Sequence, residues 1–272
     1  MSQSKRGYLE RWPAFARGLD RPTDLLGAWA SRFLGIFLRI SRRYLVVVTG
    51  ILMLVNLYLI FMVAPTDAIL GHVQRVFYFH FPMAMMSFVA FLVVFLASVT
   101  YVFRRDSRWD NLAYAAAEVG VVFISLTLIT GVIWAKPVWN AWWLWTPRLT
   151  TTLILWLIYV SYMMIRAYAP NQTKAAIYGA IMGMIGFVDV LVVYFSVQWW
   201  PGIHPAPVVG PLSESGSLDG TMRGVLGFSF LTFMFLLLYL VVERMSLRSS
   251  EDRIRSLRFL LRRSQASVVP GE

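Results

Sequence analysis

The sequence contains no cysteine, few acidic residues and only three histidines. Without cysteine, the chain has no disulfide, no CxxC redox site and no thiol to which a cofactor could be attached covalently. Any cofactor must therefore be held by histidine, methionine or packing. Asp and Glu number 14 against 25 Lys and Arg, which gives a formal net charge of +11.

Apolar residues are abundant and unevenly distributed. They make up 58% of the chain, with a mean hydropathy of +0.63, whereas soluble domains contain about 45–50%. The excess lies in long uncharged blocks, which is typical of helices that span lipid. Little chain is left for a soluble domain, so we expect one membrane domain with short loops.

Six blocks are long enough to cross a hydrocarbon core, which takes about 20 helical residues. They are Tyr44–Ala64, Tyr78–Phe103, Ala113–Trp134, Thr150–Ala167, Ala175–Val197 and Gly224–Val242. Segments of about ten residues with alternating hydrophobicity, which would indicate a membrane barrel, are not present. The predicted fold class is therefore an all-α polytopic membrane protein with six transmembrane helices.

The positive charges indicate the orientation. Of the 25 Lys and Arg residues, 21 lie in the two tails or in the loops on the same side as the tails. The opposite side has four, which are Arg75, Lys136, Arg148 and Arg223. The positive-inside rule places both termini in the cytoplasm. Because the charges flank apolar blocks, we predict a lipid bilayer as partner and no nucleic acid.

This topology predicts three regions. Residues 1–43 form a cytoplasmic basic amphipathic tail, 44–243 form the six-helix membrane domain, and 244–272 form a cytoplasmic basic C-terminal tail. Apolar residues recur at helical spacing before Arg42, which predicts a helix in the inner membrane interface; the alternative is a disordered lead-in. Three loops, 65–77, 135–149 and 198–223, face outward.

Histidine and tryptophan gather on this outer side. All three histidines, His72, His80 and His204, lie in the outer loops or at a helix end beside them, and so do seven of the eleven tryptophans. An interfacial aromatic belt would spread tryptophan over both faces. A platform for a large, flat, apolar ligand explains the one-sided cluster better, because indoles offer wide stacking surfaces.

His80 and His204 fit a bis-imidazole metal site, as used for haem iron. A structural role for both histidines is an equal alternative on the residues alone. Zinc would want three or four ligands close together, and the acidic residues of these loops are scattered. His72 is interpreted as a loop residue. Arg75 and Arg148 could pair with carboxylates of a ligand, or simply extend toward the membrane interface.

Two acids lie within predicted spans, Glu118 and Asp189. Such acids are functional candidates or partners in hydrogen bonds between helices. Gly179, Gly183 and Gly186 could mark a broken transporter helix, but small residues more often mark helix packing.

The stretch WNAWWLWTPRLT, residues 139–150, resembles the tryptophan-rich signature of haem-handling proteins in cytochrome c biogenesis, most closely their C component, haem exporter protein C. RVFYFHFPMAMMS is similar to the family segment with the first haem-ligating histidine, which falls on His80. DVLVVYFSVQWWPGIHP is similar to the segment with the second, which falls on His204. The chain departs from the family at Thr146, where aspartate is usual, and at Pro205, where glutamine is usual.

The resemblance implies a protein that binds haem at the outer, periplasmic face of the bacterial cytoplasmic (inner) membrane and delivers it to a periplasmic haem chaperone. The implied cofactor is haem b, held transiently and without covalent bonds. Implied partners are ABC transporter subunits and a small single-helix membrane subunit. The expected site residues are His80 and His204 as iron ligands, Trp139, Trp142, Trp143 and Trp145 as the platform, and Arg75 and Arg148 as propionate partners.

No nucleophile or acid–base pair is apparent, so we expect a binding and delivery role rather than an enzyme. A subunit of an ABC complex that transports haem or a small solute without its own haem-ligating site is the alternative. A cytochrome c synthase is a further alternative, although synthases that resemble this family tend to be larger and to have more histidines.

Overall fold

The computed structural model describes residues 42–200, 202, 204 and 218–268 of the 272-residue chain. The chain divides into two compact units, Met1–Tyr44 and Leu45–Glu272, and the second contains almost all of the described residues. The predicted amphipathic tail lies outside them, apart from Arg42 and Arg43 at the start of the first helix.

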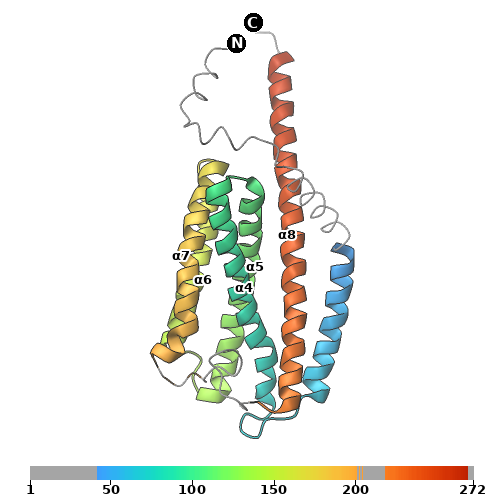
Figure 1. The fold of residues 1–272 in the computed structure, drawn as a ribbon, viewed down its shortest axis with the longest axis vertical. Coiled ribbons are helices and arrows are strands. Elements are labelled where there is room, and N and C mark those ends of the chain that lie inside the picture. The colour runs from blue at the N-terminus through green and yellow to red at the C-terminus, as the bar shows by residue number, and fades with distance from the viewer. Residues whose placement is uncertain (1–41, 201, 203, 205–217, 269–272) are drawn as a thin grey trace. The chain divides into compact units, whose positions relative to one another are not determined.

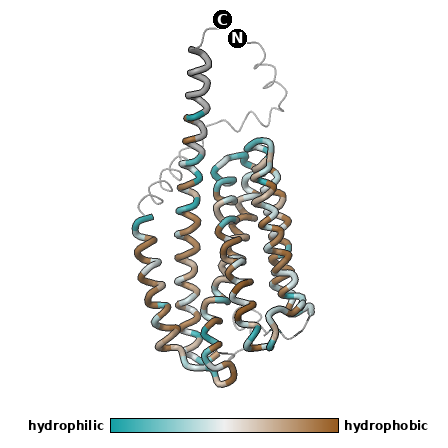
Figure 2. The backbone as a smooth tube through the Cα atoms, turned by 180° about the vertical axis from the view of Figure 1, so that it is seen from behind, coloured by the Kyte–Doolittle hydropathy of each residue, from teal (hydrophilic) through white to brown (hydrophobic). Residues whose placement is uncertain are grey.

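Six helices in the described part are long and apolar enough to cross a membrane, which confirms the predicted fold class. They are Arg42–Val63, α4 (Phe77–Arg104), α5 (Ser107–Trp139), α6 (Pro147–Tyr168), α7 (Gln172–Trp199) and α8 (Gly220–Val268). The π-helical segment η3 (Leu59–Val63) ends the first helix, and the 3-10 helix η4 (His72–Val76) precedes α4. The tube in Figure 2 is brown along most of their length, because apolar residues dominate these helices.

Two helices are longer than their apolar blocks. Helix α5 continues past Trp134 to Trp139, so the predicted loop 135–149 shrinks to 140–146. Helix α8 continues without a break through Val268, so the predicted tail after 243 begins as helix; at 1.5 Å per residue its 49 residues measure about 74 Å. Both helices extend beyond their apolar blocks because a hydropathy block reports only the part of a helix that favours lipid.

Polar residues fix the start of each helix after α4. The side chains of Asp106, Thr146 and Asn171 accept a hydrogen bond from a backbone N–H in the first turn of α5, α6 and α7. Asp219 accepts one from the N–H of Thr221 at the start of α8, 2.8 Å away. These first-turn N–H groups have no partner within the helix, so the caps stabilise the helix ends. The hydrogen bonds that the exposed Asp219 carboxyl accepts from the backbone N–H groups of Thr221 and Met222 hold its pKa below the ordinary value.

The central helices pack through close contacts between aromatic rings and glycines. Phe91 of α4 stacks on Tyr159 of α6, with ring centroids 3.6 Å apart. A Cβ on Gly183 or Gly186 of α7 would come within 2.8 Å of a neighbouring side-chain atom. Helix α7 runs unbroken through both positions, so these glycines mark helix packing and not a broken helix.

Two ion pairs tie helices together at the end of the bundle where α5 begins. Asp110 of α5 accepts two hydrogen bonds from Arg166 of α6, at 2.6 and 2.9 Å, and both side chains are buried. Glu118, one of the two acids noted in the sequence, pairs with Arg244 of α8. Glu118 therefore acts as a partner between helices. For Asp189, the other acid, one carboxylate oxygen is buried without a hydrogen-bond partner among the described residues.

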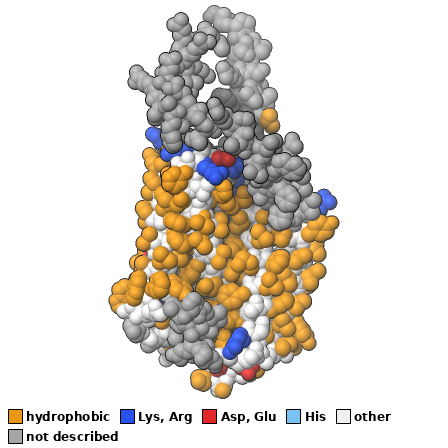
Figure 3. Space-filling view, viewed as in Figure 1, with side chains coloured by type: hydrophobic (Ala, Val, Ile, Leu, Met, Phe, Trp, Pro, Cys, Tyr) orange, Lys and Arg blue, Asp and Glu red, His pale blue; other side chains and the backbone are white. Residues whose placement is uncertain are grey.

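The outer surface of the helices is apolar. Side chains such as Leu54, Ile133 and Val188 are more than half exposed. Figure 3 shows hydrophobic side chains along the length of the helices and Lys and Arg near their ends. This distribution is typical of helices that are surrounded by lipid hydrocarbon along their length and reach a polar interface at each end.

Candidate functional site

A cavity of about 700 Å³ lies at the end of the bundle where α4 and α6 begin and α5 and α7 end. Such a volume suits a ligand of several rings. Five of the eight predicted site residues line it, namely His80, Trp139, Trp143, Arg148 and His204. Most of the other lining side chains are apolar, among them Phe77, Met85 and Trp134. The cavity is therefore a largely apolar chamber with two imidazoles, one guanidinium and the Asp67 carboxyl group on its walls.

His80 lies in the first turn of α4 and is held by α5. Its Nδ1 is 3.0 Å from Oγ1 of Thr130. A Cβ on Gly131 would be 3.2 Å from the imidazole Cε1, so the absence of a side chain there makes room for the ring. The Trp134 indole adjoins the same ring, with centroids 5.7 Å apart and planes inclined at 58°.

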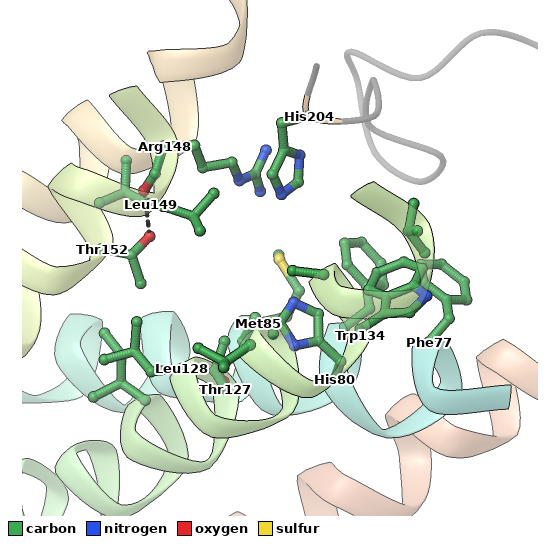
Figure 4. Close-up of a pocket in the computed structure, with 18 of the residues that line it drawn as sticks. Phe77, His80, Met85, Thr127, Leu128, Trp134, Arg148, Leu149, Thr152 and His204 are labelled. Carbon is green, nitrogen blue, oxygen red and sulfur yellow. Dashed lines mark hydrogen bonds between the residues drawn. The ribbon is translucent and has the colours of Figure 1, made fainter. Parts of the chain in front are cut away.

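His204 follows α7 and approaches the cavity from a separate part of the chain. Its ring centroid is 6.1 Å from that of Trp139, with planes inclined at 59°. In Figure 4, His204 and Arg148 lie along one side of the open space, whereas His80 and Trp134 lie along the other. Each histidine thus adjoins a tryptophan from the last two turns of α5, and both line one chamber.

The predicted tryptophan platform is divided between the chamber and the outside. Trp139 and Trp143 line the cavity, whereas Trp142 and Trp145 are 59% and 74% exposed. The ammonium of Lys136 lies 5.9 Å from the Trp142 ring centroid. Trp143 and Trp145 nevertheless pack edge to face, with ring centroids 5.7 Å apart, so the cavity-lining and the exposed indoles adjoin each other.

The two arginines predicted as propionate partners lie in different places. Arg148, the second residue of α6, lines the cavity, and the described residues include no acidic partner for it. Arg75 is not among the lining residues; it lies in η4 with its guanidinium carbon 5.9 Å from the Phe61 ring centroid. His72, at the start of η4, is exposed and outside the cavity.

Thr146, the departure from the family signature, has a local role. It is the N-cap of α6: its hydroxyl accepts a hydrogen bond from the N–H of Leu149, 3.4 Å away, and Pro147 occupies the first helical position. Threonine and aspartate are both good N-caps. The exchange therefore preserves the start of α6, the helix that brings Arg148 to the cavity.

Sequence reasoning missed two residues of this site, Thr130 and Gly131. It counted Trp134 in the outer tryptophan cluster but assigned it no contact with His80, because the helix was expected to end there. Helical spacing of positions 130, 131 and 134 places them on one face of α5, which was the available signal.

The chamber fits a large flat ligand that carries a metal ion. Imidazole is a common axial ligand of haem iron, and indoles and phenyl rings suit an apolar macrocycle. The Nε1–H groups of Trp134 and Trp143 are buried without a hydrogen-bond partner among the described residues, so donors are available to a polar group of a ligand. Within the same residues, no three His, Cys, Asp or Glu side chains gather into a metal cluster of the zinc type.

Comparison with known proteins gives consistent similarities. The profile of the family described as Heme exporter protein C matches residues 27–259. The Heme exporter protein C of Bradyrhizobium diazoefficiens is 30% identical over 232 residues, which are 85% of this chain and 86% of that protein. That of Escherichia coli strain K12 is 33% identical over 184 residues, 67% and 73% of the two chains. That of Paracoccus denitrificans is 32% identical over 200 residues, 73% and 81%.

Proposed function

Because this chain belongs to the haem exporter protein C family, a group of membrane proteins that handle haem for cytochrome c biogenesis, we propose that it binds haem in the chamber and delivers it to a periplasmic haem chaperone. One observation carries the proposal. His80 and His204, 124 positions apart in the printed sequence, line the same apolar chamber, each beside a tryptophan of α5.

In this proposal the protein holds haem b as cargo, with His80 and His204 as the two axial ligands of the iron. The chain has no cysteine, so the contact is non-covalent and reversible. Trp139 and Trp143 provide apolar walls. Arg148 pairs with a propionate, since a guanidinium and a carboxylate form strong charge-assisted hydrogen bonds.

The exposed indoles of Trp142 and Trp145 are proposed as the contact for the chaperone. Tryptophan is enriched among the few residues that supply most of the binding energy at protein interfaces. Arg75, outside the chamber, remains a weaker propionate candidate. The proposal also includes ABC transporter subunits and a small single-helix subunit as partners, and no chemical change of the cargo by this protein.

The proposed location is the bacterial inner membrane, with both termini in the cytoplasm and the chamber at the periplasmic face. Because the chain lacks cysteine, single cysteines can test this in intact cells with a membrane-impermeant maleimide. Ile69→Cys, at a 92% exposed position, should be labelled without permeabilisation, and Arg108→Cys only after it. The reverse pattern would refute the orientation.

The binding proposal is tested by haem titration of the detergent-purified protein beside His80→Ala, His204→Ala and His72→Ala. His72 is exposed and outside the cavity, which makes it a matched control. We expect a low-spin absorption spectrum that both ligand variants lose and the control keeps. A wild-type protein that takes up no haem, or three indistinguishable variants, would refute the site and favour an ABC-complex subunit without its own haem-ligating site.

A further inference from the structure

Three residues of α5 enclose the His80 imidazole. The Thr130 hydroxyl faces Nδ1 at 3.0 Å, the Gly131 backbone lies next to Cε1, and the Trp134 indole lies at 5.7 Å between centroids. Positions 130, 131 and 134 are neighbours on one face of a helix. The backbone of Thr127, in the same stretch, also hydrogen-bonds the ring. The ring is therefore held by residues 127–134 of α5.

The direction of the bond between Thr130 and His80 follows from the threonine's other contacts. Its Oγ1 is 2.7 Å from the carbonyl oxygen of Leu126 and 3.2 Å from that of Thr127. A hydroxyl has a single hydrogen, and a helical threonine typically donates it to the carbonyl four residues earlier. With its hydrogen directed to Leu126, the Thr130 oxygen is left to accept a hydrogen bond from Nδ1–H of His80.

A neutral imidazole carries one N–H, and the hydrogen bond made by that nitrogen decides which nitrogen is left to bind a metal. We infer that Thr130 is a positioning residue, which holds His80 in the Nδ1–H tautomer and presents Nε2 as its metal-binding nitrogen. This inference rests on the proposed haem site and adds to it the orientation of one ligand. By accepting this hydrogen bond, Thr130 also makes Nε2 of His80 more basic, as other hydrogen-bond acceptors do for histidines that bind a metal.

The tautomer can be measured without haem. The chain has only three histidines, so ¹⁵N-histidine labelling of the detergent-solubilised protein gives few ring signals, and His80→Ala identifies those of His80. We expect a protonated Nδ1 and a bare Nε2 in the wild type. Thr130→Val, which keeps the shape and removes the acceptor, should give a mixture of tautomers, whereas Thr130→Ser should keep the wild-type signals.

The matched control is Thr100→Val in α4. Its hydroxyl donates to the carbonyl of Leu96 at 2.7 Å, as that of Thr130 does to Leu126, and it lies outside the cavity lining. This variant should leave the His80 signals unchanged. A wild-type His80 protonated at Nε2, or a Thr130→Val spectrum identical to that of Thr100→Val, would overturn the inference.

A second readout uses haem affinity and the reduction potential of the loaded protein. We expect Thr130→Val to weaken ferric haem binding by about 10- to 100-fold, the range found when a group behind a metal ligand is removed, and to raise the potential. Thr130→Ser should restore both. If His80→Ala abolishes binding while Thr130→Val matches Thr100→Val, the inference fails and the function stands. If His80→Ala has no effect, the proposed function itself fails.

Discussion

Gly131→Ala separates helix stability from site geometry. A methyl group on Gly131 would stand 3.2 Å from Cε1 of His80, whereas non-bonded carbons prefer about 3.5–4.0 Å. The imidazole must therefore move by about 0.5 Å, and Thr130 and Trp134 border it on other sides. Functional sites tolerate only about 0.5 Å of displacement.

The same change favours the helix. Alanine is more favourable than glycine in a helix interior by about 1 kcal/mol. We therefore expect Gly131→Ala to unfold at the wild-type temperature or above it, yet to bind haem at least about tenfold more weakly, the lower end of the effect of disturbing groups that orient a metal ligand. Stability and affinity should change in opposite directions.

The assay is thermal unfolding and haem titration of the detergent-purified protein, with Gly227→Ala as the control. Gly227 lies in α8, and an added Cβ there meets nothing within 4 Å. The control should show the gain in helix propensity without the loss in affinity. Equal haem affinity in the two variants would refute the reasoning, because it would show that the His80 ring has room to move without consequence.

Three further predictions concern stability. Asp110→Ala leaves the buried Arg166 unpaired and should cost about 3–5 kcal/mol, whereas Arg108→Ala, in a largely exposed pair, should cost at most about 1 kcal/mol; equal unfolding temperatures would contradict this. Thr146→Ala should destabilise α6 by about 0.5–2 kcal/mol, and the aspartate variant should not, as measured by denaturant unfolding in detergent. Glu118→Gln weakens the ion pair to α8 and should speed hydrogen exchange in that helix; unchanged exchange would show that the pair is dispensable.

The six spans could be predicted from the sequence because transfer of a long apolar block into lipid outweighs most local preferences. The helices α5 to α8 start three to six residues before the predicted blocks. The available signal for these starts was a typical N-cap residue before each helix, namely Asp106, Thr146, Asn171 and Asp219. The far ends of α5 and α8 were not readable from the sequence. A helix continues for as long as backbone hydrogen bonding and tertiary contacts favour it, whether or not its side chains favour lipid.

For the candidate site, the sequence by itself determined the residue types: two histidines, a tryptophan cluster and an arginine, all near the same ends of their helices. Only the tertiary structure decided which of them meet. Whether Trp139 lines the chamber while Trp142 faces outward depends on where α5 ends, and Thr130 gains its role only because α4 packs against α5 at His80. Contacts between helices depend on how each helix is rotated about its own axis. A membrane helix is apolar on every face, so its sequence does not show which face meets a neighbouring helix.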